Sequence, residues 1–368
     1  MLALGGCKRA YEPAVFRSDN NYLVVDGFIN IAPGAVSSFI LSRTTNVGDS
    51  ATINHAELHA AMSIRGARGS SYTLAEKGNG VYSSAPISLD NSDQYKVFIQ
   101  TSDGDTYESD LAPCKQNPPI DSITWKLDNS VTVYVNTHDP TGQAVYYRWS
   151  YEDTWEYHSQ LTTPWIVIGG IITGSDSSNQ TTICWQSNHT SEVLLGTTAA
   201  LSQDIIYQQP VKIIPHDDER IDYKYSILVK QYALTQEAYN YWQIIQKNTQ
   251  QTGTLFDLLP SQLEGNIHSL KFSGEPVIGY ISATVEQQKR IFITHTSLGV
   301  QWQSNPPGYS CPILNIPRDP RGFEYWTYPD SSFAPYYFVT GDGIMITKKN
   351  CLDCTLRGGI NHQPPFWQ

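Results

Sequence analysis

Short stretches of apolar or alternating apolar and polar residues recur along the first third of the chain. Turn-forming residues such as Pro33-Gly34 and Gly78-Asn79-Gly80 separate them. This spacing predicts a small immunoglobulin-like antiparallel β-sandwich over residues 22–115. Prolines at 113, 118 and 119 place the domain boundary near residue 116, because proline cannot continue a central strand. The predicted strands are 22–31, 37–42, 60–65, 81–83 and 95–100.

The same period-two pattern continues through the rest of the chain. It predicts a larger β-rich domain over residues 116–368, ending in an aromatic, proline-rich and cysteine-containing stretch. The predicted strands of this domain are 122–127, 130–136, 145–151, 165–172, 181–186, 204–214, 221–231, 277–285 and 290–294.

One segment departs from the strand pattern. Ala238, Tyr241, Trp242 and Ile245 follow the i, i+3, i+4, i+7 spacing of one helix face, and Thr235 suits the N-cap. The sequence therefore predicts one amphipathic helix inserted near residues 235–252 of a mainly β, two-domain chain.

Composition and charge exclude several classes of protein. The 368 residues include 24 Lys and Arg against 35 Asp and Glu, a formal net charge of −11. A nucleic-acid-binding surface needs clustered basic residues, so nucleic acid is not an expected partner. With 40% hydrophobic and 16% charged residues, the chain is not of the disordered class. Its 23 tyrosines are the unusual feature.

The first residues suggest a lipid anchor. Leu4-Gly5-Gly6-Cys7 resembles the lipobox of bacterial lipoproteins, in which the cysteine is lipidated. Six residues before Cys7 are too few for a complete signal peptide, so we interpret residues 1–21 as a truncated signal, the lipobox and a tether. The sequence contains no run of 18 apolar residues, so it predicts no membrane-spanning helix. The alternative is a chance cysteine near a frayed terminus.

The remaining cysteines predict disulfides. An exported protein meets an oxidising environment, where neighbouring cysteines pair. Cys351 and Cys354 form a CxxC motif that suits half of a zinc site, but no second pair at ligand spacing accompanies it. Cys114 is then unpaired. The disulfide candidates are Cys184, Cys311, Cys351 and Cys354, and their connectivity is left open.

A set of short motifs covers nearly the whole mature chain. The motifs are Tyr11-Glu12-Pro13, Leu23-Val24-Val25-Asp26-Gly27, the segment from 225 to 232, Gly253 to Pro260, Gly265-Asn266-Ile267, Val277 to Ala283, Lys289-Arg290-Ile291-Phe292-Ile293, Cys351 to Asn361 and Pro365-Phe366-Trp367. Together they resemble a known family, the Bacteroidota exported lipoproteins described as domain of unknown function 4249.

The resemblance implies a cellular location and a set of neighbouring genes, but no activity and no cofactor. Proteins of this family are often encoded beside TonB-dependent outer-membrane receptors of the SusC type. The resemblance therefore implies attachment to the outer membrane, with a TonB-dependent receptor as partner. We expect the cell surface over the periplasmic face, although Lys8-Arg9 is a poor version of the acidic surface-export signal.

Two polar motifs contain residue types that can bind metal ions. His55, Glu57 and His59 would share one face of a strand, but the zincin order H-E-x-x-H is absent. The run from His216 to Glu219 lacks the spacing that wraps a calcium ion. A solvated sheet face and a solvated turn are the favoured interpretations, so no metal site and no cofactor are predicted.

Catalytic motifs are also missing. The G-x-S-x-G elbow is absent, and no spacing singles out His138, His158 or His295 as the base of a nucleophile. We therefore predict a protein that is not an enzyme, with a hydrolase as the weakest alternative.

Two groups of aromatic residues are the candidates for an interface or a glycan or peptide ligand, because Tyr and Trp combine large area with a polar group. The alternative is that they pack a domain core. On this reading the chain is an accessory of a TonB-dependent uptake complex, which docks on the receptor or holds nutrient. The alternative function is a structural or envelope-assembly lipoprotein without a small ligand. The candidates are Trp149, Tyr151, Trp155, Tyr157, Tyr325, Trp326, Tyr328, Tyr336 and Tyr337.

Overall fold

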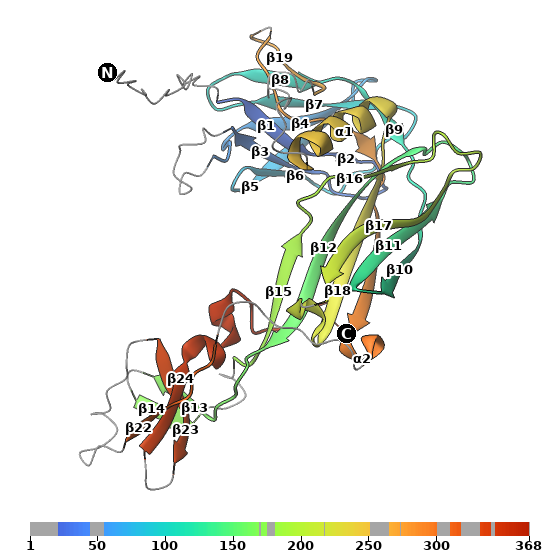
Figure 1. Cartoon of the computed structure of the whole chain (residues 1–368). Helices are drawn as coiled ribbons and strands as arrows, with labels where there is room; N and C mark the ends of the chain where they lie inside the picture. The colour runs from blue at the N-terminus through green and yellow to red at the C-terminus, as the bar shows by residue number, and fades with distance from the viewer. Residues whose placement is uncertain are drawn as a thin grey trace, which may run out of the picture. The chain divides into compact units, whose positions relative to one another are not determined.

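The computed structural model divides the chain into two units (Figure 1). Unit 1 comprises Met1–Cys114 and Leu259–Ala283, and unit 2 comprises Lys115–Leu258 and Thr284–Gln368. The structure describes residues 21–44, 55–168, 171–174, 181–216, 218–250, 265–272, 274–299, 310–317, 332–339 and 343–367.

Unit 1 is built from antiparallel strands whose side chains alternate between core and solvent. Phe39 and Leu41 are buried two positions apart on one strand, as the period of two requires, and Ile64, Val97 and Tyr107 are buried on three others. The strand order is β1-β3-β6-β5-β4-β7-β9-β20-β2, with β8 between β7 and β19. The strands are β1 (Leu23–Gly27), β2 (Ile29–Asn30), β3 (Ser38–Arg43), β4 (Ala61–Gly66), β5 (Ser71–Gly78), β6 (Val81–Ser84), β7 (Gln94–Gln100), β8 (Thr106–Ser109), β9 (Ala112–Lys115), β19 (Ile267–Ser269) and β20 (Ala283–Thr284).

A distant segment completes unit 1. Residues 265–283 were expected in the second domain, but they pair with strands of the first (Figure 1). Strand β19 pairs with β8, and the Val25 N–H donates to the Ile278 carbonyl at 2.8 Å. Gly279 has φ +143°, and a methyl group there would overlap the Val25 carbonyl oxygen, so this crossing requires glycine. The pairing depends on contacts remote in sequence, which strand periodicity does not reveal.

Unit 2 contains two sheets around one core. The three-stranded sheet has the order β10-β11-β17, and the larger one has the order β15-β12-β18-β21 with β16 beside β12. Val133 from the first sheet and Tyr225 from the second belong to the same buried cluster, so the sheets face each other. The strands are β10 (Ile120–Leu127), β11 (Ser130–His138), β12 (Tyr146–His158), β15 (Ile183–His189), β16 (Leu194–Thr197), β17 (Ile205–Pro215), β18 (Lys224–Ala233) and β21 (Gln287–Thr294).

The predicted helix is present as α1 (Gln236–Gln250). The Ala238 N–H donates to the Thr235 hydroxyl at 3.2 Å, which is the N-cap bond expected from the sequence. Ala238 and Tyr241 are buried on the predicted face. This local prediction is therefore confirmed.

The C-terminal stretch forms a further small sheet that the sequence pattern did not predict. Its order is β22-β24-β23, and a β13-β14 hairpin accompanies it. Ile344 and Ile346 of β24 are fully buried. The elements are β13 (Trp165–Ile168), β14 (Ile171–Gly174), α2 (His295–Leu298), β22 (Leu314–Pro317), β23 (Phe333–Val339), β24 (Gly343–Lys348) and the short 3-10 turns η1 (Glu219–Ile221), η4 (Lys349–Cys351) and η5 (Cys354–Arg357).

The mainly β class is confirmed, since strands outnumber helices throughout the described residues. Within those residues, neither α1 nor α2 combines the length and apolar character needed to cross a bilayer.

Candidate functional site

All four candidate cysteines form disulfides. Cys184 bonds to Cys354 and Cys311 bonds to Cys351, so the zinc interpretation of the CxxC motif is wrong. The pairing ties strand β15 to the turn η5 and ties the chain before β22 to the turn η4, which follows β24. Cys114 is free and half-buried, and burial raises the pKa of its thiol to about 11, so it stays protonated near neutral pH.

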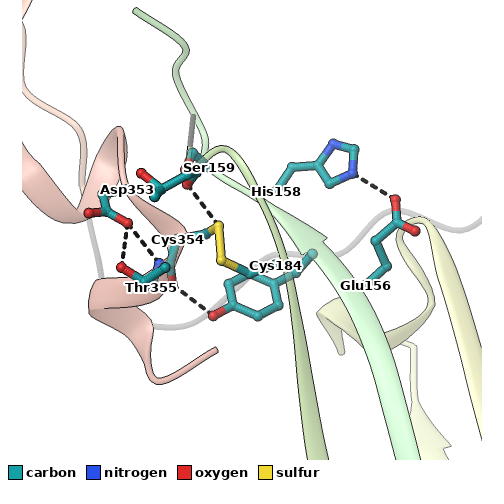
Figure 2. The surroundings of a disulfide bond; sticks show 9 residues. Glu156, His158, Ser159, Cys184, Asp353, Cys354 and Thr355 are labelled. Atoms are coloured by element: carbon teal, nitrogen blue, oxygen red, sulfur yellow. Dashed lines mark hydrogen bonds and ion pairs between the residues drawn. A yellow bond between two sulfur atoms is a disulfide. The ribbon is translucent and has the colours of Figure 1, made fainter. Parts of the chain in front are cut away.

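Figure 2 shows the first disulfide and its neighbours. The Tyr157 hydroxyl donates to the Cys354 carbonyl at 2.8 Å, and the Asp353 carboxylate accepts from the Thr355 N–H at 2.9 Å. Gly359 lies against the Tyr157 ring, where a side chain would overlap the hydroxyl. These contacts fix the η5 turn on the end of strand β12.

A histidine–glutamate pair lies beside this disulfide. His158 Nε2 is 2.8 Å from Glu156 Oε1 (Figure 2), and the His158 ring stacks on Tyr223 with centroids 3.5 Å apart. The hydrogen bond from His158 is the main cause that lowers the pKa of Glu156. The other carboxylate oxygen accepts from Trp367 Nε1 at 3.3 Å. This pair is therefore engaged in holding the C-terminal segment.

The C-terminal segment covers the face of the larger sheet that points away from the core. Ile360 forms a bridge with Trp185 of β15. Trp367 is buried against Phe292, with ring centroids 5.7 Å apart. The Arg290 guanidinium lies 3.7 Å from the centroid of Phe366. Cation–π and edge-to-face contacts thus anchor the tail.

The first aromatic group does not form a surface. Trp149, Tyr151, Trp155 and Tyr157 lie on β12, which extends seven residues beyond the predicted strand, and all four are buried in the unit 2 core. The interface interpretation of this group is wrong, and the packing alternative is correct. The sequence does indicate this burial, because all four residues occupy odd-numbered positions of a period-two pattern and therefore share one face of a strand.

The second group is partly exposed. Tyr336 and Tyr337 lie on β23 with ring centroids 4.9 Å apart, and Tyr337 is 43% exposed. Tyr337 lies opposite Met345 of β24 in the register, and β22, on the other side of β24, exposes Leu314. Tyr325, Trp326 and Tyr328 lie outside the described residues, as does the proposed lipidation site Cys7.

The polar motifs have structural partners. Arg43 Nε lies 2.6 Å from Glu57 Oε2, and the His59 N–H donates to Glu76. Asp218 caps the turn η1, and Glu219 pairs with Arg357. Over the described ranges, no group of three or more His, Cys, Asp or Glu side chains is arranged to hold a metal ion.

A buried polar cluster in unit 2 was missed by sequence reasoning. Asp153 is fully buried on β12, between the inward positions of Tyr151 and Trp155. The Tyr225 hydroxyl donates to Asp153 Oδ2 at 3.0 Å, and Lys212 Nζ lies 3.8 Å from the same oxygen. The available signal was an acidic residue at an inward position of an aromatic strand.

These features define a mainly β protein of two units whose second unit is closed by disulfides. The chain matches the model of the family described as "Domain of unknown function (DUF4249)" over residues 8–290, so it belongs to that family. No curated protein matches it. The structure of the Yersinia pseudotuberculosis adhesin InvE is similar at 10% identity and a TM-score of 0.15, covering 59% of this chain and 57% of that one. The match thus spans little more than half of the adhesin, and a score this low implies no shared function.

Proposed function

We propose that this chain is an exported lipoprotein, attached to the outer membrane through Cys7, that serves a TonB-dependent uptake receptor as a non-enzymatic accessory. It docks on the receptor or holds nutrient near it. The observation that carries the docking part is the exposed Tyr337 on a small sheet braced by a disulfide.

The two disulfides support the export part of the proposal. Disulfides persist in oxidising compartments and are rare in the bacterial cytosol. Cys184, Cys351 and Cys354 are fully buried, which suits permanent structural bonds. Membership of the family supports the receptor part of the proposal, because proteins of this family are often encoded beside TonB-dependent receptors.

The geometry around Tyr337 suits a protein contact. Tyrosine offers a large amphipathic area at a low cost in conformational entropy, which is why it is enriched at interfaces. The Cys311–Cys351 bond joins the chain before β22 to the turn after β24, so these two antiparallel strands are tied together at one end of the sheet that presents Tyr337. A rigid exposed aromatic loses little freedom on binding.

The docking part is tested by affinity capture from cross-linked outer membranes. Tyr337→Ser is expected to reduce recovery of the TonB-dependent receptor at least severalfold. Tyr207→Ser is the matched control, because Tyr207 is 76% exposed on β17 and is expected to leave recovery unchanged. Equal recovery with both variants, or no receptor with the unchanged protein, would contradict docking through this surface.

The anchor is tested separately. Cys7→Ala is expected to move the protein from the membrane fraction to the soluble fraction, since one lipid-modified residue supplies the attachment. Retention in the membrane fraction would show that the anchor is elsewhere.

Glycan and peptide arrays, followed by measurements of the melting temperature, test the nutrient part, because a bound ligand raises the melting temperature. Receptor capture without any shift in melting temperature would support docking and not nutrient binding. If the protein neither captured the receptor nor bound a ligand, an envelope-assembly role would be favoured.

A further inference from the structure

The buried cluster around Asp153 joins the two sheets of unit 2. Asp153 lies on β12 of the larger sheet, and Lys212 reaches it from β17 of the three-stranded sheet. A register shift between Val133 and Tyr134 marks a bulge in this part of β17, where Val211 is buried and Lys212 is also mostly covered. The bulge turns a lysine toward the core, as bulges re-aim side chains.

The pair is enclosed by aromatic side chains. Asp153 is fully buried, and only 13% of the Lys212 side chain is exposed. Lys212 Nζ donates to the Tyr151 hydroxyl at 3.0 Å and lies 3.8 Å from Asp153 Oδ2. Asp153 Oδ1 is buried and has no hydrogen-bond partner. A plain structural ion pair would be expected to satisfy both oxygens, so this carboxyl group is poorly accommodated as a carboxylate.

We propose that Lys212 and Asp153 become joined by an intramolecular isopeptide bond, which cross-links β17 to β12. This is a covalent modification of the chain's own core and is independent of the proposed receptor partner.

The reaction needs no reagent from outside. The Lys212 ammonium transfers one proton to the Asp153 carboxylate, and the resulting amine attacks Cγ. The Nζ–Cγ bond forms, one Cγ–Oδ bond breaks, and the oxygen leaves as water with two of the three ammonium protons. One proton stays on the amide nitrogen, so atoms and charge balance.

The surroundings favour the protonated form of the Asp153 carboxyl group. Burial raises the pKa of the Asp153 carboxyl, against the opposing effect of the Lys212 and Arg220 charges. The Tyr225 hydroxyl donates to Oδ2 and supplies a hydrogen bond to charge that develops on that oxygen. The Arg220 guanidinium lies 4.9 Å from the centroid of Trp155, where its charge also acts on Asp153. The fold holds the two reacting groups together, which replaces a bimolecular encounter.

The test is a peptide map of the full chain, reduced, denatured and digested with trypsin. No Lys or Arg lies between Arg148 and Lys212, and Arg220 is the next site after Lys212. An amide on Lys212 blocks cleavage there, so the expected product is one peptide, 149–220, lighter than its sequence mass by one water. The lipid proposed on Cys7 lies in another peptide and does not affect this result.

The matched control is Lys212→Arg, which keeps the positive charge and the trypsin site but cannot form the amide under these conditions. It is expected to yield separate peptides 149–212 and 213–220 at full mass. Cleavage after Lys224 reports complete digestion in both samples. Finding unmodified peptide 149–212 as the main product of the unchanged chain would overturn the proposal, and this outcome does not depend on whether any variant folds.

Discussion

Unit 1 and unit 2 each close a β core, but with different chemistry. Unit 1 uses a returning chain segment, residues 265–283, held by backbone pairing and by close glycine contacts. Its one described cysteine, Cys114, is free. Unit 2 uses two disulfides and a C-terminal tail anchored by aromatic contacts. Closure of unit 1 therefore depends on steric fit, and closure of unit 2 depends on redox state.

The largest expected difference between the units follows from removing a disulfide. Cys184 and Cys354 are 170 residues apart, so their bond restricts a long loop of the unfolded chain. The double variant Cys184→Ala with Cys354→Ala is expected to destabilise unit 2 by about 2–5 kcal/mol. Hydrogen exchange resolved by peptide should show faster exchange in β12 and β15 and unchanged exchange in β3 and β4. Equal acceleration in both units would mean that they do not unfold independently.

The next prediction breaks the closure of unit 1. Gly279 adopts φ +143°, and a side chain there meets the Val25 carbonyl oxygen. Gly279→Ala is expected to cost at least about 1–3 kcal/mol, because it combines an unfavourable backbone conformation with a steric clash. The measurement is the denaturation midpoint of unit 1, followed by exchange of the β1 amides.

The matched control for this variant lies in the same segment. Gly274 also has a positive φ, +94°, but no atom lies near the added methyl group. Gly274→Ala is therefore expected to show the backbone cost alone, about 1 kcal/mol. If the two variants were equally destabilised, close packing at Gly279 would not be what holds the segment.

Some of these features were predictable from sequence and others were not. The α1 helix was predicted because its apolar face and its Thr235 cap depend on residues only three or four positions apart in the sequence. The cysteines that form disulfides were predicted from their number and from the oxidising compartment expected for an exported protein. Their connectivity depends on which strands lie side by side in the fold. The return of residues 265–283 to unit 1 is a long-range pairing, and no local pattern specifies its partner.

The candidate site was predicted unevenly for a related reason. Trp149 lies within the predicted strand 145–151 and Trp155 lies beyond its end, although the alternation of the aromatic residues fits the long strand β12 that buries both. Aromatic content indicates large buried or contact area, but only the fold decides which. The Asp153 cluster escaped notice because its partners come from β17 and β18, remote in sequence.

A third prediction tests the polar contact that supports closure of unit 1. The Tyr107 hydroxyl donates to Glu275 Oε1 at 2.9 Å, and the other Glu275 oxygen is buried without a partner. Tyr107→Phe leaves the whole carboxylate without this donor and is expected to destabilise unit 1 by about 1–2 kcal/mol. Double-mutant analysis with Glu275→Gln should recover part of this cost, because the amide carries no charge. Additive costs would indicate that the two side chains are not coupled.

The smallest expected effect concerns the His158–Glu156 pair, which holds the tail of unit 2. His158 lowers the pKa of Glu156 below its usual 4.5 in the folded state. A depressed carboxyl pKa stabilises the fold above the unfolded pKa, and this contribution is lost as pH falls from about 4.5 through the folded pKa. Because the pair is partly exposed, the contribution is expected to be below about 1 kcal/mol.

Glu156→Gln keeps an acceptor for Trp367 but removes the charge, so the difference in unfolding free energy between the unchanged protein and this variant should narrow as pH falls below 4.5. Asp90→Asn is the control in unit 1, since the lowered pKa of Asp90 comes mainly from the hydrogen bond that the Ser92 N–H donates. A gap that stays constant with pH would mean that the Glu156 side chain holds the tail by packing and hydrogen bonding alone, so closure of unit 2 would owe nothing to charge.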